Sequence, residues 1–275
     1  MKCKIIDIDG IRTRYLYEGS GPLLLLLHPV GTSGDMFCRN IDVLAKDFTV
    51  VAPDVLGHGF TGMVDLKGGP PQPAVIEHLG KLVDRLGFTS FCVGGNSYGG
   101  LLSPLMYFAR PHQVKKIVMI GSASTFHPPE EINATLKNTF ANALSAMENP
   151  TWASCVKRLA NIVYDPASVP LELMPIQLTS YAYPDRVDAF KQTLLGMMAA
   201  ADSKTVRVYH RLEEIKAPAL VICGRNDIRA NWQWHEKGVA RMPNARLEVF
   251  ENCGHLPQSE HPDKFNRLIR EFLIG

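Results

Sequence analysis

The sequence has no long hydrophobic run, no closely paired cysteines and no excess of charge of one sign. Its apolar stretches, such as Leu23 to Leu27, are far shorter than the ~20 residues that a membrane helix needs. The six cysteines are scattered without any C-x-x-C pair, which predicts neither a disulfide framework nor a zinc site. The 29 basic and 27 acidic side chains nearly balance, so the charge gives no footprint for nucleic acid or an anionic membrane.

The start of the chain also lacks the features of a targeting segment. Its first residues are charged, and no apolar core segment or small-residue cleavage site follows them. Together with cysteines that we expect to be reduced, this predicts a cytoplasmic protein. We expect its partner to be a small-molecule substrate, with no nucleic acid and no membrane bound, and a homo-oligomer is left open. A length of 275 residues with 46% hydrophobic content favours one large domain, or one domain with an insertion.

What the sequence does have is an alternation of short apolar runs with helical stretches. Asp9-Gly10 separates two alternating segments and predicts a hairpin turn, because both residues tolerate positive φ. The apolar runs predict further strands at 23–27, 48–52, 91–93, 116–120, 220–223 and 247–250. Helices are expected over 36–45, 75–86, 99–109, 232–241 and 262–273. This order predicts an α/β fold with a mostly parallel central sheet flanked by helices.

The alternation stops at Gly121 and resumes after Leu212. Between them no strand-like run occurs, and the segment has the pattern of helices separated by prolines. We therefore expect a core of residues 1–121 and 213–275, with a helical cap of residues 122–212 inserted between two core strands. Pro104 is an irregularity, because a proline inside a helix removes a hydrogen bond and should kink it.

One motif predicts a nucleophile. Gly95-Asn96-Ser97-Tyr98-Gly99 is a G-x-S-x-G sequence between a predicted strand and a predicted helix. The flanking glycines allow a sharp turn that leaves the Ser97 hydroxyl accessible at the start of the helix. We expect Ser97 to attack substrate.

A serine nucleophile needs a base and a group that orients the base. Among nine histidines, His255 follows a predicted strand and should lie on a loop at the carboxyl end of the sheet. His235, at the start of a predicted helix, is expected on the solvated surface. Asp227 follows another strand, upstream of His255, which gives the chain order Ser, Asp, His expected on such a sheet. The predicted triad is Ser97, Asp227 and His255.

The triad also needs two backbone N–H groups that hold a developing oxyanion. Tyr98, directly after the nucleophile, should supply one of them. The loop after the strand at 23–27 should supply the other, and because Pro29 has no N–H, the candidate is Val30. His28 is expected to brace this loop.

No cofactor and no metal ion is expected. Residues 57–62 match G-x-G-x-x-G, but a loop follows them rather than the helix that a dinucleotide site requires. No pair of histidines has the spacing of metal ligands.

Over essentially the whole chain, these segments resemble the α/β-hydrolase superfamily. The motifs are most similar to those of the meta-cleavage-product hydrolases, which cut carbon–carbon bonds in ring-fission products of aromatics. The shared segments are 95–100, 223–227, 253–255, 260–261 and 265–268. The resemblance implies the same triad. We also expect Asn96 and Trp152 to contact substrate.

Two positions depart from the family pattern. Leu256 stands where the family carries Trp after its catalytic histidine, and Gln177 stands near the place of a cap arginine thought to hold the substrate carboxylate. Both are expected to contact substrate. We therefore expect a serine hydrolase that cleaves a carboxylic ester of a small, moderately apolar substrate through an acyl-enzyme.

Other functions stay open. The first alternative is carbon–carbon hydrolysis of 2-hydroxy-6-oxo-dienoates, in which case Arg158 or Arg186 should replace the missing arginine. A non-hydrolytic ligand-binding member of the fold and a cofactor-free oxygenase are further alternatives.

Overall fold

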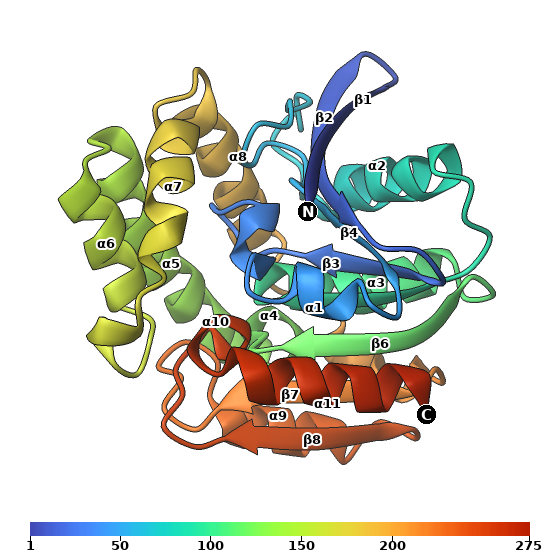
Figure 1. The fold of residues 1–275 in the computed structure, drawn as a ribbon. Helices are drawn as coiled ribbons and strands as arrows, with labels where there is room; N and C mark the ends of the chain where they lie inside the picture. The colour runs from blue at the N-terminus through green and yellow to red at the C-terminus, as the bar shows by residue number, and fades with distance from the viewer.

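The computed structural model describes all 275 residues and is built around an eight-stranded sheet (Figure 1). The strand order is β1-β2-β4-β3-β5-β6-β7-β8. The strands are β1 (Lys2–Ile8), β2 (Ile11–Glu18), β3 (Leu23–Leu27), β4 (Thr49–Pro53), β5 (Phe91–Asn96), β6 (Val114–Ile120), β7 (Ala219–Gly224) and β8 (Ala245–Phe250). All neighbouring strands from β4 to β8 pair parallel, whereas β2 pairs antiparallel with both β1 and β4. The mostly parallel sheet predicted from the sequence is confirmed.

The central strands are continuous apolar runs because helices cover both faces of the sheet. Leu23 and Leu25 of β3 belong to a core cluster of 51 residues, which includes the inner faces of α2 (Gln72–Arg85) and α3 (Tyr98–Ala109). Leu24 and Leu26 point to the opposite face. There a cluster of 18 residues includes side chains of α1 (Ile41–Leu44) and α11 (Pro262–Ile274). Successive side chains of a strand point to opposite faces of the sheet, so each strand contributes to two separate cores.

The hairpin of β1 and β2 turns where the sequence predicts. Asp9 has φ of 53° and Gly10 has φ of 84°, the left-handed conformations that a two-residue turn requires.

The single helix expected over 36–45 is wrong. The chain forms a 3-10 turn, η1 (Gly34–Phe37), and then the short α1. Two buried polar side chains account for the break. Asp35 pairs with Arg14 at 2.7 Å, and Asn40 donates to Asn266 at 2.9 Å. These tertiary contacts outweigh the local helical pattern.

Pro104 has a structural use inside α3. Because it lacks an N–H, the carbonyl of Gly100 has no helical donor. The Thr125 hydroxyl donates to that carbonyl at 3.1 Å from α4 (Ala123–Phe126). The proline thus leaves an acceptor through which α4 is attached to α3.

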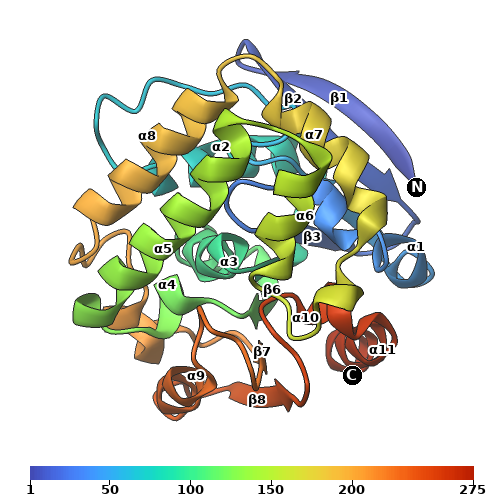
Figure 2. The same cartoon turned by 90° about the vertical axis from the view of Figure 1, so that its left-hand side faces the viewer.

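Between β6 and β7 the chain forms helices only. We call four of them the cap helices: α5 (Pro129–Glu148), α6 (Trp152–Ala160), α7 (Met174–Tyr181) and α8 (Arg186–Ala199). They lie beyond the carboxyl ends of the parallel strands (Figure 1), in front of α3 when viewed from that side (Figure 2). The remaining helices are α9 (Trp232–Val239), α10 (Pro257–Glu260) and the short turns at 166–168, 171–173 and 209–214. No helix of the chain combines the length and the apolar character needed to cross a membrane.

Candidate active site

Ser97 occupies a strained turn between β5 and α3. Its φ of 56° lies in the left-handed region, which a residue with a side chain rarely adopts. Glycine is required on both sides, because a Cβ at Gly99 would collide with the Leu27 carbonyl and one at Gly95 would collide with Gly99. The Ser97 N–H donates to the Ile120 carbonyl at 2.8 Å, which holds the turn against β6. The side chain therefore stands at the edge of the sheet, at the start of α3.

Asp227 and His255 meet at the same edge from the loops after β7 and β8. The imidazole Nδ1 lies 2.7 Å from Oδ2 of Asp227. The other carboxylate oxygen accepts the backbone N–H groups of Arg229 at 2.8 Å and Ala230 at 3.0 Å. Burial by itself would raise the pKa of Asp227, but His255 and the two amides hold this pKa below its ordinary value. An ionised Asp227 accepts a hydrogen bond from Nδ1–H of His255, so Nε2 is the ring nitrogen that can act as the base.

Ser97 and His255 face one crevice. No hydrogen bond joins the Ser97 hydroxyl to the imidazole, whose Nδ1 is bonded to Asp227. In enzymes of this kind the catalytic hydrogen bonds are often long before substrate binds and tighten in the complex.

Glu260 holds the loop that carries His255, a role that the sequence does not predict. Glu260 accepts backbone N–H groups from Gly254 at 2.9 Å, Leu256 at 3.0 Å and Tyr164 at 2.8 Å. Two of these donors flank His255, and the third follows α6 of the cap. The carboxylate thus fixes the His255 loop and joins it to the cap.

Asn96 lies beneath the triad and does not line the crevice, so the expectation that it contacts substrate is wrong. Its amide nitrogen donates to the carbonyls of Ile120 and His255, both at 3.1 Å. Its oxygen accepts from Gln258 at 3.1 Å. These hydrogen bonds of the Asn96 side chain hold the His255 backbone against the end of β6.

The loop after β3 carries Val30, one of the two residues expected to donate to an oxyanion. The carbonyl of Pro29 accepts the Thr32 hydroxyl at 2.7 Å and lies 2.8 Å from Nδ1 of His28. In a trans peptide the next N–H points the opposite way, so the Val30 N–H is directed away from these partners. Neither the Val30 nor the Tyr98 N–H donates within the protein, and both residues line the crevice.

Three cap side chains converge on the next carbonyl of this loop. The oxygen of Gly31 accepts from Nη1 of Arg158 at 2.5 Å, from the Tyr181 hydroxyl at 2.8 Å and from Nε2 of Gln177 at 3.3 Å. Gln177 is buried and does not line the crevice. The expectation that it contacts substrate is wrong, because the residue binds the loop instead.

Two further expectations about single residues are wrong. Trp152 is 49% exposed at the start of α6 and lies outside the crevice. His235 is fully buried rather than solvated, and its Nε2 accepts the N–H of Ser122 at 3.1 Å. Burial lowers the pKa of His235 to about 4. By contrast, Leu256 does line the crevice.

The crevice consists of two chambers that meet at the triad. Both are bordered by Val30, Ser97, Arg229 and His255. The α5 chamber is further lined by Tyr98, Ala123, Ser124, Thr135, Leu136, Thr139 and Met197. The α6 chamber is further lined by Pro29, Thr32, Met36, Asn142, Arg158, Leu159, Ile162 and Leu256. No acidic side chain lines either chamber.

Two arginines give the crevice a positive character. Neither Arg158 nor Arg229 forms a salt bridge. Burial, with a smaller repulsion from Arg229, lowers the pKa of Arg158 to about 9, and burial lowers the pKa of Arg229 as well. The sequence predicts Arg158 only as a substitute for the missing arginine, and no sequence pattern predicts Arg229, which lies two residues after Asp227.

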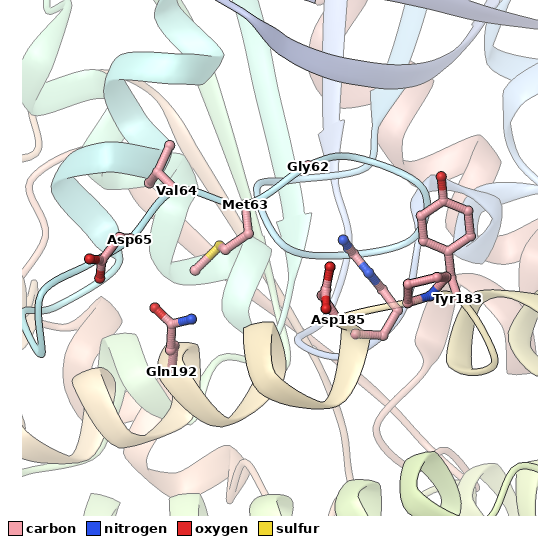
Figure 3. A pocket seen from close by; sticks show the side chains of 9 residues that line it. Gly62, Met63, Val64, Asp65, Tyr183, Asp185 and Gln192 are labelled. Atoms are coloured by element: carbon pink, nitrogen blue, oxygen red, sulfur yellow. The ribbon is translucent and has the colours of Figure 1, made fainter.

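Arg186, the other substitute considered, is not at the crevice. It lines a separate open hollow between the segment 62–65 and the start of α8 (Figure 3). Its Nη1 donates to the Thr61 carbonyl at 2.8 Å. It therefore cannot hold a group of a substrate bound at Ser97.

The fold and the arrangement of these residues are those of an α/β hydrolase. Residues 22–262 match the model of the family described as alpha/beta hydrolase fold, and the chain belongs to that family. Within it, the chain falls in the branch of meta-cleavage-product hydrolases.

One relative supports this placement, and two solved structures support the fold. The chain is 33% identical to a 2-hydroxy-6-oxononadienedioate/2-hydroxy-6-oxononatrienedioate hydrolase of Burkholderia vietnamiensis, over 96% of this chain and 92% of the relative. A 2-hydroxy-6-oxo-6-phenylhexa-2,4-dienoate hydrolase from Rhodococcus superposes with a TM-score of 0.80 at 22% identity, covering 100% of both chains. An esterase from Thermogutta terrifontis superposes with a TM-score of 0.79 at 20% identity, covering 100% of this chain and 98% of the other. At these low identities the two structural matches establish the fold alone.

Proposed function

We propose that this protein hydrolyses the carbon–carbon bond of a 2-hydroxy-6-oxo-dienoate, with Ser97, His255 and Asp227 as its triad. The observation that carries the proposal is Arg158, a buried cation without an acidic partner in the α6 chamber. A buried guanidinium without a counter-ion is costly, and a substrate carboxylate removes that cost on binding. The relatives named for dienoate substrates support the same class.

This proposal replaces the ester as the principal substrate. The sequence favours an ester because Gln177 stands where the family resemblance implies a cap arginine, which leaves no cation for a carboxylate. Arg158 comes from another cap helix, α6, yet its side chain faces the crevice. An uncharged ester would leave the cation unpaired.

In the proposed complex the carbonyl carbon C6 lies at Ser97, and the dienoate arm extends into the α6 chamber. The C1 carboxylate then faces Arg158. Two of the five guanidinium N–H groups are used by Val30 and Gly31, which leaves three for the ligand. The acyl arm on the other side of C6 extends into the α5 chamber.

The reaction begins with the keto form of the substrate, in which the C2 hydroxyl proton has left and C5 has gained a proton. The Ser97 oxygen forms a bond to C6 while His255 accepts the hydroxyl proton and the Val30 and Tyr98 amides hold the oxyanion. The C5–C6 bond then breaks. Its electron pair moves through the C3–C4 double bond to the C2 oxygen, which takes the proton from His255.

The remaining acyl group is bound to Ser97 as an ester. A water molecule, deprotonated by His255, attacks this ester and releases a carboxylic acid. The sum is one water consumed, with a 2-hydroxypenta-2,4-dienoate and an acid formed.

The test compares kcat/KM for a 2-hydroxy-6-oxo-dienoate and for an aryl ester with the same acyl arm. We expect the dienoate to be preferred by about tenfold or more, since about 1.4 kcal/mol of differential binding gives that factor. Arg158→Gln should reduce this preference. Arg158 also holds the Val30 and Gly31 carbonyls, so the ester kcat/KM of the variant measures any damage to that loop. The ratio of dienoate to ester kcat/KM then reports the effect of the lost charge alone. A preference of the unmodified enzyme for the ester would refute the proposal.

A further inference from the structure

The peptide between Ser97 and Tyr98 carries a proposed oxyanion donor at one end and a carbonyl at the other. In a trans peptide these two groups point in opposite directions, so whatever holds the Ser97 carbonyl also sets the direction of the Tyr98 N–H. The orientation of this peptide is given by the ψ angle of Ser97, which is −108° and combines with the φ of 56° in a region that side chains disfavour. Contacts made by the carbonyl are therefore needed to keep the N–H in its direction.

Two donors hold the Ser97 carbonyl. The N–H of Leu101 donates to it at 3.2 Å, which is the bond that the first turn of α3 supplies. The hydroxyl of Ser122 donates to it at 2.8 Å from the segment that follows β6. The hydroxyl bond is the shorter of the two, and it comes from outside α3.

Ser122 is itself held in place by its neighbours. Its side chain is fully buried, and its oxygen lies 2.9 Å from the Thr125 hydroxyl. Its N–H donates to Nε2 of His235 at 3.1 Å. Nδ1 of His235 lies 2.9 Å from the Asn231 carbonyl, so Nδ1 carries the proton and Nε2 is the acceptor. The Ser122 hydroxyl therefore has a fixed position next to the nucleophile.

The residue before Ser122 packs against the other two members of the triad. A Cβ at Gly121 would lie 3.2 Å from Oδ2 of Asp227 and 3.5 Å from Nδ1 of His255. The chain thus passes directly against the hydrogen bond between acid and base, and one residue later it bonds to the peptide after the nucleophile. This short segment fixes both parts of the triad relative to each other.

We propose that Ser122 is a positioning residue for the oxyanion site. Its hydroxyl holds the peptide after Ser97 so that the Tyr98 N–H is directed at the carbonyl oxygen of the substrate. Ser122 lines neither chamber and so acts only through this peptide. The inference rests on the proposed triad, and it holds whether the bond that breaks is a carbon–carbon bond or an ester.

The first experiment is steady-state kinetics of Ser122→Ala, with whichever dienoate or aryl ester the enzyme hydrolyses. An oxyanion donor acts when negative charge develops, so kcat should fall about tenfold while KM changes less than about twofold. This value lies between the loss of one ordinary hydrogen bond, about fivefold, and the loss of a complete oxyanion donor, about 100-fold or more. Ser122→Thr keeps a hydroxyl and should restore most of kcat.

Ser103→Ala is the matched control. Ser103 is also fully buried, and its hydroxyl donates to the Gly99 carbonyl at 2.8 Å, but the N–H of that peptide belongs to Gly100, which is not a proposed oxyanion donor. Its kcat should stay within about twofold of the unmodified enzyme, and urea unfolding shows whether the two variants are equally stable. If Ser122→Ala does not fold, Ser122→Cys keeps the volume with a weak donor and replaces it, with the same expectation. Equal losses of kcat at the two positions overturn the inference.

The second experiment needs no turnover. With 1,1,1-trifluoro-4-phenylbutan-2-one, the Ser97 oxygen forms a bond to the ketone carbon, the π electron pair becomes an oxyanion, and the hydroxyl proton passes to His255. The matching alcohol, 1,1,1-trifluoro-4-phenylbutan-2-ol, cannot form this adduct. The ketone should bind more tightly than the alcohol in calorimetry, and Ser122→Ala should reduce the ratio of the two affinities about tenfold. Ser103→Ala should leave the ratio unchanged.

The two experiments separate the inference from the proposed function. A ratio that is unchanged in Ser122→Ala overturns the role of Ser122 while the triad stands. If the ratio falls but no dienoate is hydrolysed, the role of Ser122 stands and the proposed reaction fails. If the ketone binds the unmodified enzyme no more tightly than the alcohol, Ser97 forms no adduct, and both are refuted.

Discussion

The hydroxyl of Tyr181 donates a 2.8 Å hydrogen bond to the carbonyl of Gly31. The first residue ends a cap helix, and the second directly follows Val30, whose N–H is proposed to hold the oxyanion. The bond therefore sets the orientation of a catalytic loop from outside the core.

Tyr181→Phe should lower kcat with little change in KM. The loss of one hydrogen bond of about 1 kcal/mol, felt mainly in the transition state, corresponds to roughly a fivefold decrease. Steady-state kinetics with any substrate that the enzyme hydrolyses measure this decrease in kcat. Tyr183→Phe removes a hydroxyl from the half-exposed neighbour and should leave kcat unchanged. Equal effects of the two changes would exclude a role of the Gly31 bond.

Ser97→Ala and Asp227→Asn should each slow turnover by roughly three orders of magnitude or more, with residual activity from the oxyanion donors. The first change removes the nucleophile, and the second removes the acceptor that holds the His255 tautomer. Mass spectrometry after treatment with a fluorophosphonate should find one adduct, on Ser97. An adduct on another residue, or turnover that survives in Ser97→Ala, would show that the triad is assigned wrongly.

Glu260→Gln should destabilise the protein and reduce activity. The amide that replaces one carboxylate oxygen is a donor, so it cannot accept the three backbone N–H groups of Gly254, Leu256 and Tyr164. Unpaired donors of this kind cost about 1–3 kcal/mol. Urea unfolding measures the loss. The same substitution at the exposed Glu236 is the control and should be neutral.

Stability should fall as the pH decreases from about 6.5 toward 4, in part through His235. The folded protein holds this pKa at about 4, below the ordinary 6.5, whereas the unfolded chain binds the proton at the higher pH. Between these values the unfolded state carries more protons, so the free energy of unfolding decreases with decreasing pH, by roughly 3 kcal/mol for the full interval.

Urea unfolding at several pH values tests this. His235→Gln should be less stable near neutral pH, because the bond from Ser122 is weakened, but its stability should depend less steeply on pH. The exposed His112→Gln should keep the original slope. A slope unchanged in His235→Gln would assign the acid sensitivity to other groups.

Local sequence patterns were sufficient for the elements of the core. The run at 23–27 and the turn at Asp9-Gly10 have the form that a buried parallel strand and a hairpin impose on any sequence. The positions of Ser97, Asp227 and His255 at strand ends also followed from the sequence, because the carboxyl ends of parallel strands meet at one edge. The helix over 36–45 failed because the contacts of Asp35 and Asn40 come from distant parts of the chain.

Sequence patterns also do not show which cap residues face the crevice, because this too depends on contacts between distant parts of the chain. Which side of a helix faces a crevice depends on how several helices pack, and periodicity alone does not show it. The sequence predicts that Gln177 and Trp152 contact substrate, but Gln177 donates to the Gly31 carbonyl and Trp152 is exposed at the surface. Arg158 is a charged residue that no local rule would bury, and its environment became visible only with the packing of α6 against the loop after β3.

The three donors on the Gly31 carbonyl set a condition for redesigning this enzyme. The predicted triad is carried by the core strands, whereas about half of the residues that line the chambers are carried by helices between β6 and β7. A cap taken from another hydrolase should therefore bring its own substrate range. The Gly31 oxygen is one point at which the core and the cap are not independent. A grafted cap without a donor at this position would leave the oxyanion loop unsupported, and a graft that keeps the equivalents of Arg158, Gln177 and Tyr181 would preserve the chemistry while the rest of the cap is varied.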